Sequence, residues 1–122
     1  MPVIKTQQSA VLGRGTWIYA SDVIATAETD VMGGATRVRT IIADNSDNAA
    51  NSYLKIWDAK TVTVGTTAPD FIFELPPNQA CIIEMEEDST GSVRFTSALS
   101  FACTTTAGSA GTTSPTSNVL LW

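Results

Sequence analysis

Carboxylates are the clustered side chains of this sequence that could do acid–base chemistry, and the chain contains no histidine. Histidine is the usual group that moves a proton near neutral pH, so Ser-His and Cys-His mechanisms are excluded. Four carboxylates cluster in one short segment, namely Glu84, Glu86, Glu87 and Asp88. A pair of carboxylates can hydrolyse a glycosidic bond. However, the first two alternate with Ile83 and Met85, which is typical of the solvated face of a strand. We therefore interpret the cluster as a strand face that enters a turn, and we expect no enzyme.

A second segment rich in oxygen atoms runs from Asp44 to Asn48, and hard cations bind several oxygens in a short loop. An EF-hand that began at Asp44 would need glycine in place of Ala49 and glutamate in place of Lys55. The segment therefore favours a turn-capping loop over an irregular calcium site. The Gly13-Arg14-Gly15 step lacks the preceding strand and the lysine of a phosphate-binding loop. We expect no metal and no cofactor.

The two cysteines, Cys81 and Cys103, each lie two positions from a large apolar residue in an alternating pattern. This placement favours two free thiols in the core, whereas a disulfide between them would need an oxidising compartment. The spacing of a Cys-x-x-Cys zinc or redox motif does not occur.

The composition bounds the classes of function. A chain of 122 residues, 43% hydrophobic and 16% charged, is expected to fold as one domain. Its formal net charge of −5 repels a phosphate backbone, so we expect no binding to nucleic acid. The sequence contains neither an apolar run long enough to span a membrane nor the apolar core of a secretory signal. We expect a protein that is not bound to a membrane and is used without Sec-type translocation.

Short alternating apolar runs separated by turn residues predict an antiparallel β-sandwich, with a jelly-roll or an immunoglobulin-like topology. The predicted strands are 37–42, 53–57, 71–75, 81–85, 93–95, 99–103 and 119–122. The residues predicted to share the core face are Phe71, Phe73, Leu75, Cys81, Ile83, Met85, Leu99, Phe101 and Cys103. The last strand is apolar, so we expect it to be paired and buried. Residues 21–29 have a weaker alternation, which is also compatible with a short helix.

Residues 1–15 show no sustained period and predict an extended N-terminal arm, followed by the sandwich domain over residues 16–122. The apolar residues of the arm are Val3, Ile4, Val11 and Leu12. They are too few to offset an ordering entropy of roughly 1–2 kcal/mol per residue, so we expect the arm to be ordered only against a neighbouring subunit.

Four aromatic residues are candidates for partner binding, namely Trp17, Tyr19, Tyr53 and Trp57. In the strand at 53–57, Leu54 and Ile56 alternate with the aromatic residues, so the aliphatic side is expected to face the core. Exposed aromatic residues with a polar group suit both protein interfaces and sugar stacking. The alternative is that these side chains form a second packed face beneath the N-terminal segment.

From Asn51 onward the order of elements resembles small virion structural proteins of tailed bacteriophages. The resemblance rests on the segments Tyr53–Ala59, Thr63–Asp70, Leu75-Pro76 and Val93–Ser100, and on the apolar-aromatic end of the chain. The family usually has glycine where this chain has Ser97-Ala98. The resemblance implies a capsid cement or decoration protein on the capsid surface of the virion, assembled in the host cytoplasm. It further implies binding to the major capsid protein and association with itself as a homotrimer.

Two functions are therefore expected from different classes. The first is a capsid cement or decoration protein that stabilises the phage head shell. The alternative is a small carbohydrate- or receptor-binding β-sandwich module of a phage tail, which would need an exposed row of Trp57 with Tyr53 or Tyr19.

Overall fold

The computed structural model of this protein describes residues 3–7, 16–85 and 92–122. Within these residues the chain forms strands and connecting loops, and every strand pair is antiparallel. The strands are β1 (Val3–Gln7), β2 (Thr16–Val23), β3 (Thr36–Val38), β4 (Thr40–Asp44), β5 (Ser52–Asp58), β6 (Phe71–Leu75), β7 (Ala80–Glu84), β8 (Val93–Phe95), β9 (Leu99–Thr104) and β10 (Val119–Leu121). All seven predicted runs coincide with strands to within one or two residues, except that the first run, 37–42, contains two strands, β3 and β4.

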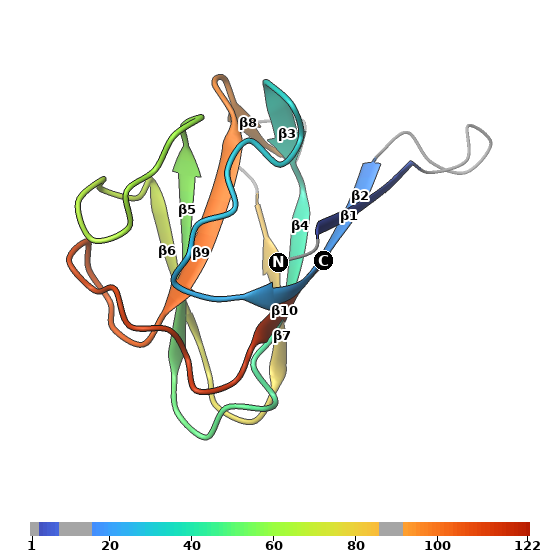
Figure 1. The fold of residues 1–122 in the computed structure, drawn as a ribbon. Coiled ribbons are helices and arrows are strands. Elements are labelled where there is room, and N and C mark those ends of the chain that lie inside the picture. Colours follow the sequence, from blue (N-terminus) through green and yellow to red (C-terminus); the bar gives the residue numbers. More distant parts are fainter. Residues whose placement is uncertain (1–2, 8–15, 86–91) are drawn as a thin grey trace.

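The strands form two facing layers (Figure 1). One layer is a five-stranded sheet with the order β1-β2-β10-β4-β7, and the other is a three-stranded sheet with the order β6-β5-β9. The short pair β3-β8 closes one end of the molecule. This arrangement confirms the predicted all-β, antiparallel sandwich.

The core lies between the two sheets, where the side chains that point inward at every second position of each strand pack together. Five of the nine predicted core residues are buried, namely Leu75, Met85, Leu99, Phe101 and Cys103. The other four, Phe71, Phe73, Cys81 and Ile83, are partly buried and pack against that cluster. The five-stranded sheet adds a second set that includes Val23, Ile41, Val119 and Leu121. Complete burial of each large apolar side chain contributes about 1.5–3 kcal/mol, so this double layer is the main source of stability.

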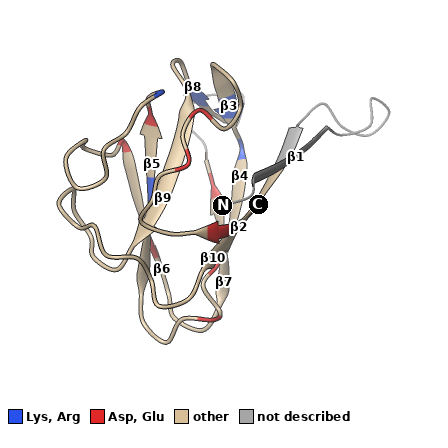
Figure 2. Ribbon diagram, in the orientation of Figure 1, with Lys and Arg blue, Asp and Glu red and all other residues tan. Residues whose placement is uncertain are grey.

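The predicted strand at 37–42 is divided in two, which corrects the sequence-based boundary. Residue Arg39 separates β3, which pairs with β8, from β4, which pairs with β10 and β7. The Arg39 carbonyl still accepts a hydrogen bond from the Met85 backbone N–H at 2.7 Å. The alternation breaks at this bend, because Arg39 and Thr40 are both exposed, and these two successive polar residues mark the boundary in the sequence. Two exposed arginines, Arg37 and Arg94, are register partners at this end, while acidic side chains are scattered over the body (Figure 2).

The described part of the N-terminal arm is a strand that pairs within its own chain. The register of β1 on β2 runs from Val3 opposite Ala20 to Gln7 opposite Thr16, and this hairpin extends away from the sandwich (Figure 1). The expectation that the whole arm is ordered only by a neighbour is therefore wrong for these residues, because β2 supplies the backbone partners. Val11 and Leu12 lie outside the described residues.

The segment predicted as a weak strand or a short helix over residues 21–29 is a strand only as far as Val23. Beyond it, the backbone of Glu28 exchanges two hydrogen bonds with Phe101 at 2.9 and 3.0 Å. The segment thereby covers the outer edge of β9.

Both cysteines are free thiols, as predicted, with Cys103 buried and Cys81 partly buried. Burial raises the pKa of Cys103 to about 12 and also raises the pKa of Cys81. The described residues contain no helix long and apolar enough to cross a membrane.

Candidate partner-binding surface

An apolar row crosses the outer face of the five-stranded sheet. The row consists of Tyr19 on β2, Trp122 after β10, Ile42 on β4 and Ile82 on β7. Trp122 and Ile42 exchange backbone hydrogen bonds at 2.9 and 3.0 Å, and Ile42 is the register partner of Ile82. The rings of Tyr19 and Trp122 are 5.1 Å apart between centroids. In the backbone register of β1, Ile4 is the partner of Tyr19.

The apolar row exists because inward and outward residues alternate along each strand. Inward Ala20, Ile41 and Leu121 are buried in the core, so their neighbours in sequence face outward. Two outward side chains are large and exposed, since 67% of Ile82 and 37% of Trp122 is accessible to solvent. Beside the row, the Thr40 hydroxyl donates to the Glu84 carboxylate at 3.3 Å. An exposed apolar stripe with a polar border has the composition of a protein interface.

The four predicted aromatic residues are not brought together. Tyr19 belongs to the apolar row, while Tyr53 lies on the other sheet, where its hydroxyl donates to Glu74 at 3.2 Å. Trp57 is only 1% exposed, and its indole N–H donates to the Thr67 carbonyl at 3.0 Å. The prediction that Trp57 is a partner-binding residue is therefore wrong for the folded chain, because the loop after β5 covers it. Trp17 belongs to β2, and its side chain is not among those described.

Loops cover the outer side of β5 in the three-stranded sheet, whereas Ile72 on β6 is 39% exposed. Leu54 and Ile56 face the core as predicted, but Lys55 on the opposite side is also buried, with 1% of its surface exposed. Its ammonium lies 3.5 Å from the Gly111 carbonyl, and burial lowers the pKa of this lysine. A Cβ at Gly111 would clash with the Thr106 hydroxyl and would lie 3.4 Å from the ammonium, so the cover fits closely over Lys55. This sheet offers a smaller apolar surface to a partner than the five-stranded sheet does.

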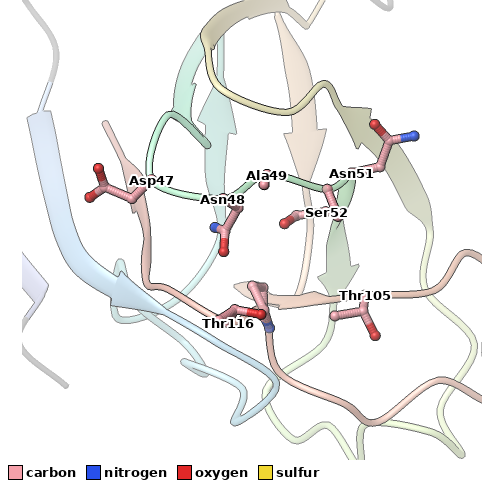
Figure 3. A pocket seen from close by; sticks show the side chains of 9 residues that line it. Asp47, Asn48, Ala49, Asn51, Ser52, Thr105 and Thr116 are labelled. Atoms are coloured by element: carbon pink, nitrogen blue, oxygen red, sulfur yellow. The ribbon is translucent and has the colours of Figure 1, made fainter.

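A polar hollow of about 230 Å³ lies at the end of the sandwich opposite β3 and β8 (Figure 3). It is lined by Asp47, Asn48, Ala49, Ala50, Asn51, Ser52, Thr105, Pro115 and Thr116. The Asn48 amide donates to the Asn45 side chain and to the Ser117 carbonyl, both at 2.9 Å, and accepts from the Ser117 N–H at 2.7 Å. These bonds join the loop after β4 to the segment before β10, so Asn48 has a structural role at the hollow.

The predicted turn-capping loop is confirmed at the same end. The Asp44 carboxylate accepts a hydrogen bond from the Ser46 N–H at 2.9 Å, and the bonds from Ser46 lower the pKa of Asp44. Among the described residues, no group of three or more histidine, cysteine, aspartate or glutamate side chains could hold a metal ion. The polar side chains of this loop form hydrogen bonds with its backbone where strand β4 ends.

Two further carboxylates meet beside a shallow hollow at Asp58 and Asp70. The Asp58 carboxylate accepts from the backbone N–H groups of residues 96–98 at 2.8 to 3.2 Å, and from the Thr96 hydroxyl at 3.1 Å. The Asp70 carboxylate accepts from the Asp58 N–H at 2.6 Å. Burial raises the pKa of Asp58, but its hydrogen bonds lower it more. Asp58 caps the turn at residues 96–98 and Asp70 bonds the end of β5, and the lowered pKa of Asp58 suits a cap rather than a general acid.

Sequence reasoning missed three residues of the apolar row, namely Ile42, Ile82 and Trp122. The signal was present, because Leu120 and Trp122 alternate with Val119 and Leu121, and only one of these two pairs can face the core. What the sequence lacks is the strand order, which places the outward residues of distant segments side by side. A scan against protein-family models, a search of curated proteins and a search of solved structures each found no match for this chain.

Proposed function

We propose that this protein is a non-enzymatic structural component of a phage virion, a capsid cement or decoration protein that binds the major capsid protein and stabilises the head shell. The observation that carries the proposal is the apolar row of Tyr19, Trp122, Ile42 and Ile82 across one sheet. Such a row provides surface to bury against a protein partner, whereas the carboxylates of Asp58 and Asp70 accept hydrogen bonds from the backbone. The resemblance of the strand and turn segments to virion proteins supports the same conclusion.

The proposal includes association with itself as a homotrimer, assembly in the host cytoplasm and a final location on the capsid surface. The hairpin of β1 and β2 supports an attachment role, since it extends away from the sandwich (Figure 1). The buried state of Trp57 weighs against the carbohydrate-binding alternative, which needs this side chain in an exposed row.

The test is co-sedimentation with head shells of the phage or prophage that encodes the chain. We expect the wild type to sediment with the shells and Trp122→Ser to bind at least tenfold more weakly. The matched control is Tyr53→Ser on the opposite sheet, which should bind like the wild type. Failure of the wild type to bind shells, with electron microscopy placing it elsewhere in the particle or outside it, would overturn the proposal.

The arm is tested in the same assay by removal of residues 1–15. We expect the sandwich to stay folded, as measured by circular dichroism, because its core residues begin at Ala20. Attachment to the shell should weaken. Unchanged attachment would show that the arm is not an anchor, and loss of folding would show that β1 is integral to the domain.

A further inference from the structure

Strand β7 is the last strand of the five-stranded sheet, and no other described strand pairs with its outer side, the open side. In its register with β4, the Asn45 N–H bonds to the Gln79 carbonyl and the Met85 N–H bonds to the Arg39 carbonyl. In an antiparallel ladder, alternate residues form such bonded pairs. The odd-numbered residues of β7 therefore bond to β4. The even-numbered residues, Ala80, Ile82 and Glu84, direct their N–H and C=O groups toward the open side.

Exposed edges are normally guarded by charged side chains, proline, a bulge or a covering segment. Among the described residues, β7 carries one of these protections, the charge of Glu84 at its end. The sequence of β7 is Ala-Cys-Ile-Ile-Glu, and its register with β4 is continuous over all five residues. By contrast, the outer edge of β9 is covered, because residues 24, 28 and 31 exchange backbone hydrogen bonds with it. Beside the open edge of β7 stands Ile82, whose side chain is 67% exposed.

We propose that β7 binds β7 of a second copy of this chain in an antiparallel pair about a two-fold axis at Ile82. Each copy then supplies the same surface, as a closed two-fold interface requires. Ile82 stands opposite Ile82 of the second copy, and Ala80 stands opposite Glu84. This register satisfies the free backbone groups of the three even-numbered residues on both copies.

The register is selected by its side chains. Centring the pair on Ile83 would place Glu84 against the exposed isoleucine of the second copy, and centring it on Cys81 would separate the two isoleucines. Centring it on Ile82 buries both isoleucines together and keeps the two Glu84 carboxylates apart, which avoids a repulsive like-charge pair. The two five-stranded sheets become one continuous sheet, and their apolar rows meet end to end.

The inference goes beyond the proposed function and does not depend on it. A β7 pair has two-fold symmetry, whereas the proposed homotrimer has three-fold symmetry and needs a different surface. The two associations are therefore distinguished by the size of the species and by its response to a change at Ile82.

The first experiment tests the register by cross-linking Ile82→Cys in a chain that also carries Cys81→Ser. Residues of a hydrogen-bonded antiparallel pair have Cα atoms about 5.5 Å apart, within the range for a disulfide. Mild oxidation should give a disulfide-linked dimer on non-reducing gels. The matched control, Ile72→Cys with Cys81→Ser, places a thiol on β6, an edge strand of the other sheet, and should stay monomeric under the same treatment because β7 is the pairing edge. Efficient cross-linking through Cys81 of the wild type instead would overturn the register.

The second experiment measures association by sedimentation equilibrium of the full chain from 1 to about 100 µM. We expect a monomer–dimer equilibrium, weakened at least tenfold by Ile82→Glu and unchanged by Ile72→Glu, with unchanged circular dichroism for both variants. A wild type that stays monomeric throughout would overturn the β7 contact. A trimer that ignores Ile82→Glu would also overturn it, while supporting the three-fold association of the proposed function.

Discussion

Replacing Asn45 by alanine removes the side chain that joins the β4–β5 loop to the turn between β6 and β7 at one end of the sandwich. Asn45 is completely buried. Its amide donates to the carbonyls of Ala50 at 3.1 Å, Leu75 at 3.2 Å and Pro76 at 3.0 Å. Its side-chain oxygen accepts from the Asn48 amide at 2.9 Å and from the Ser52 hydroxyl at 2.8 Å. One side chain therefore connects the loop after β4, the start of β5 and the turn between β6 and β7.

The expected loss of stability follows from these contacts. A net hydrogen bond contributes about 1 kcal/mol, and a buried group left without a partner costs about 1–3 kcal/mol. The amide has two hydrogens for three carbonyls, so its bonds are shared. Asn45→Ala should lower the free energy of unfolding by roughly 3–5 kcal/mol, a large part of the ~5–15 kcal/mol of a typical domain.

Urea unfolding followed by tryptophan fluorescence measures this loss. With a slope of about 1–3 kcal/mol per molar urea, we expect the midpoint to fall on the order of 2 M. The control is Asn51→Ala, an exposed residue of the same loop whose amide bonds only to the Glu74 carboxylate at 3.1 Å, and it should change stability by less than about 0.5 kcal/mol. A loss below about 1 kcal/mol for Asn45→Ala, or equal losses in both variants, would refute the role assigned to this network.

Three further predictions concern buried or capped ionisable groups. Burial lowers the pKa of Lys55 from its usual 10.5, so the charge of Lys55 destabilises the fold at neutral pH. This destabilisation becomes smaller as the pH rises through the lowered pKa toward 10.5. Lys55→Met should therefore raise the urea midpoint at pH 7 and raise it less at pH 10. The pKa of Asp58 is lowered from 3.8, so ionised Asp58 stabilises the fold. In acid-unfolding curves, the wild type should have a higher free energy of unfolding than Asp58→Asn above pH 3.8. This difference should disappear as the pH falls through the lowered pKa. Alkylation of the native protein at pH 8 followed by mass spectrometry should modify Cys81 well before Cys103, and modification of both at equal rates would contradict the buried position of Cys103.

The strands could be predicted from the sequence because alternation is a local property. Phe71–Leu75 and Leu99–Thr104 are strands whose apolar positions recur every second residue. The bend at Arg39 was missed, although two successive polar residues, Arg39 and Thr40, break the alternation there. The choice between jelly-roll and immunoglobulin-like connections was also left open by sequence reasoning, because strand order depends on contacts between distant segments.

The candidate surface was only partly predictable for the same reason. Tyr19 was identified as an aromatic residue in a strand, and it belongs to the apolar row. Trp57 was misplaced because the residue that covers it, Thr67, lies in a loop whose path the strand pattern does not determine. Lys55 is buried by a segment more than fifty residues away, at Gly111. Alternation gives the two faces of a strand, but packing decides which outer face stays exposed.

The reactivity of the buried Lys55 amine can report the local opening of the segment that covers it. An amine-reactive reagent can modify Lys55 only when the segment that carries Gly111 lifts from the sheet, because the ammonium is enclosed in the closed state. Lys60, exposed in the following loop, reacts without any opening and serves as an internal reference. The ratio of labelling at Lys55 to labelling at Lys60 therefore measures how often this cover opens, under conditions where the rest of the sandwich stays folded.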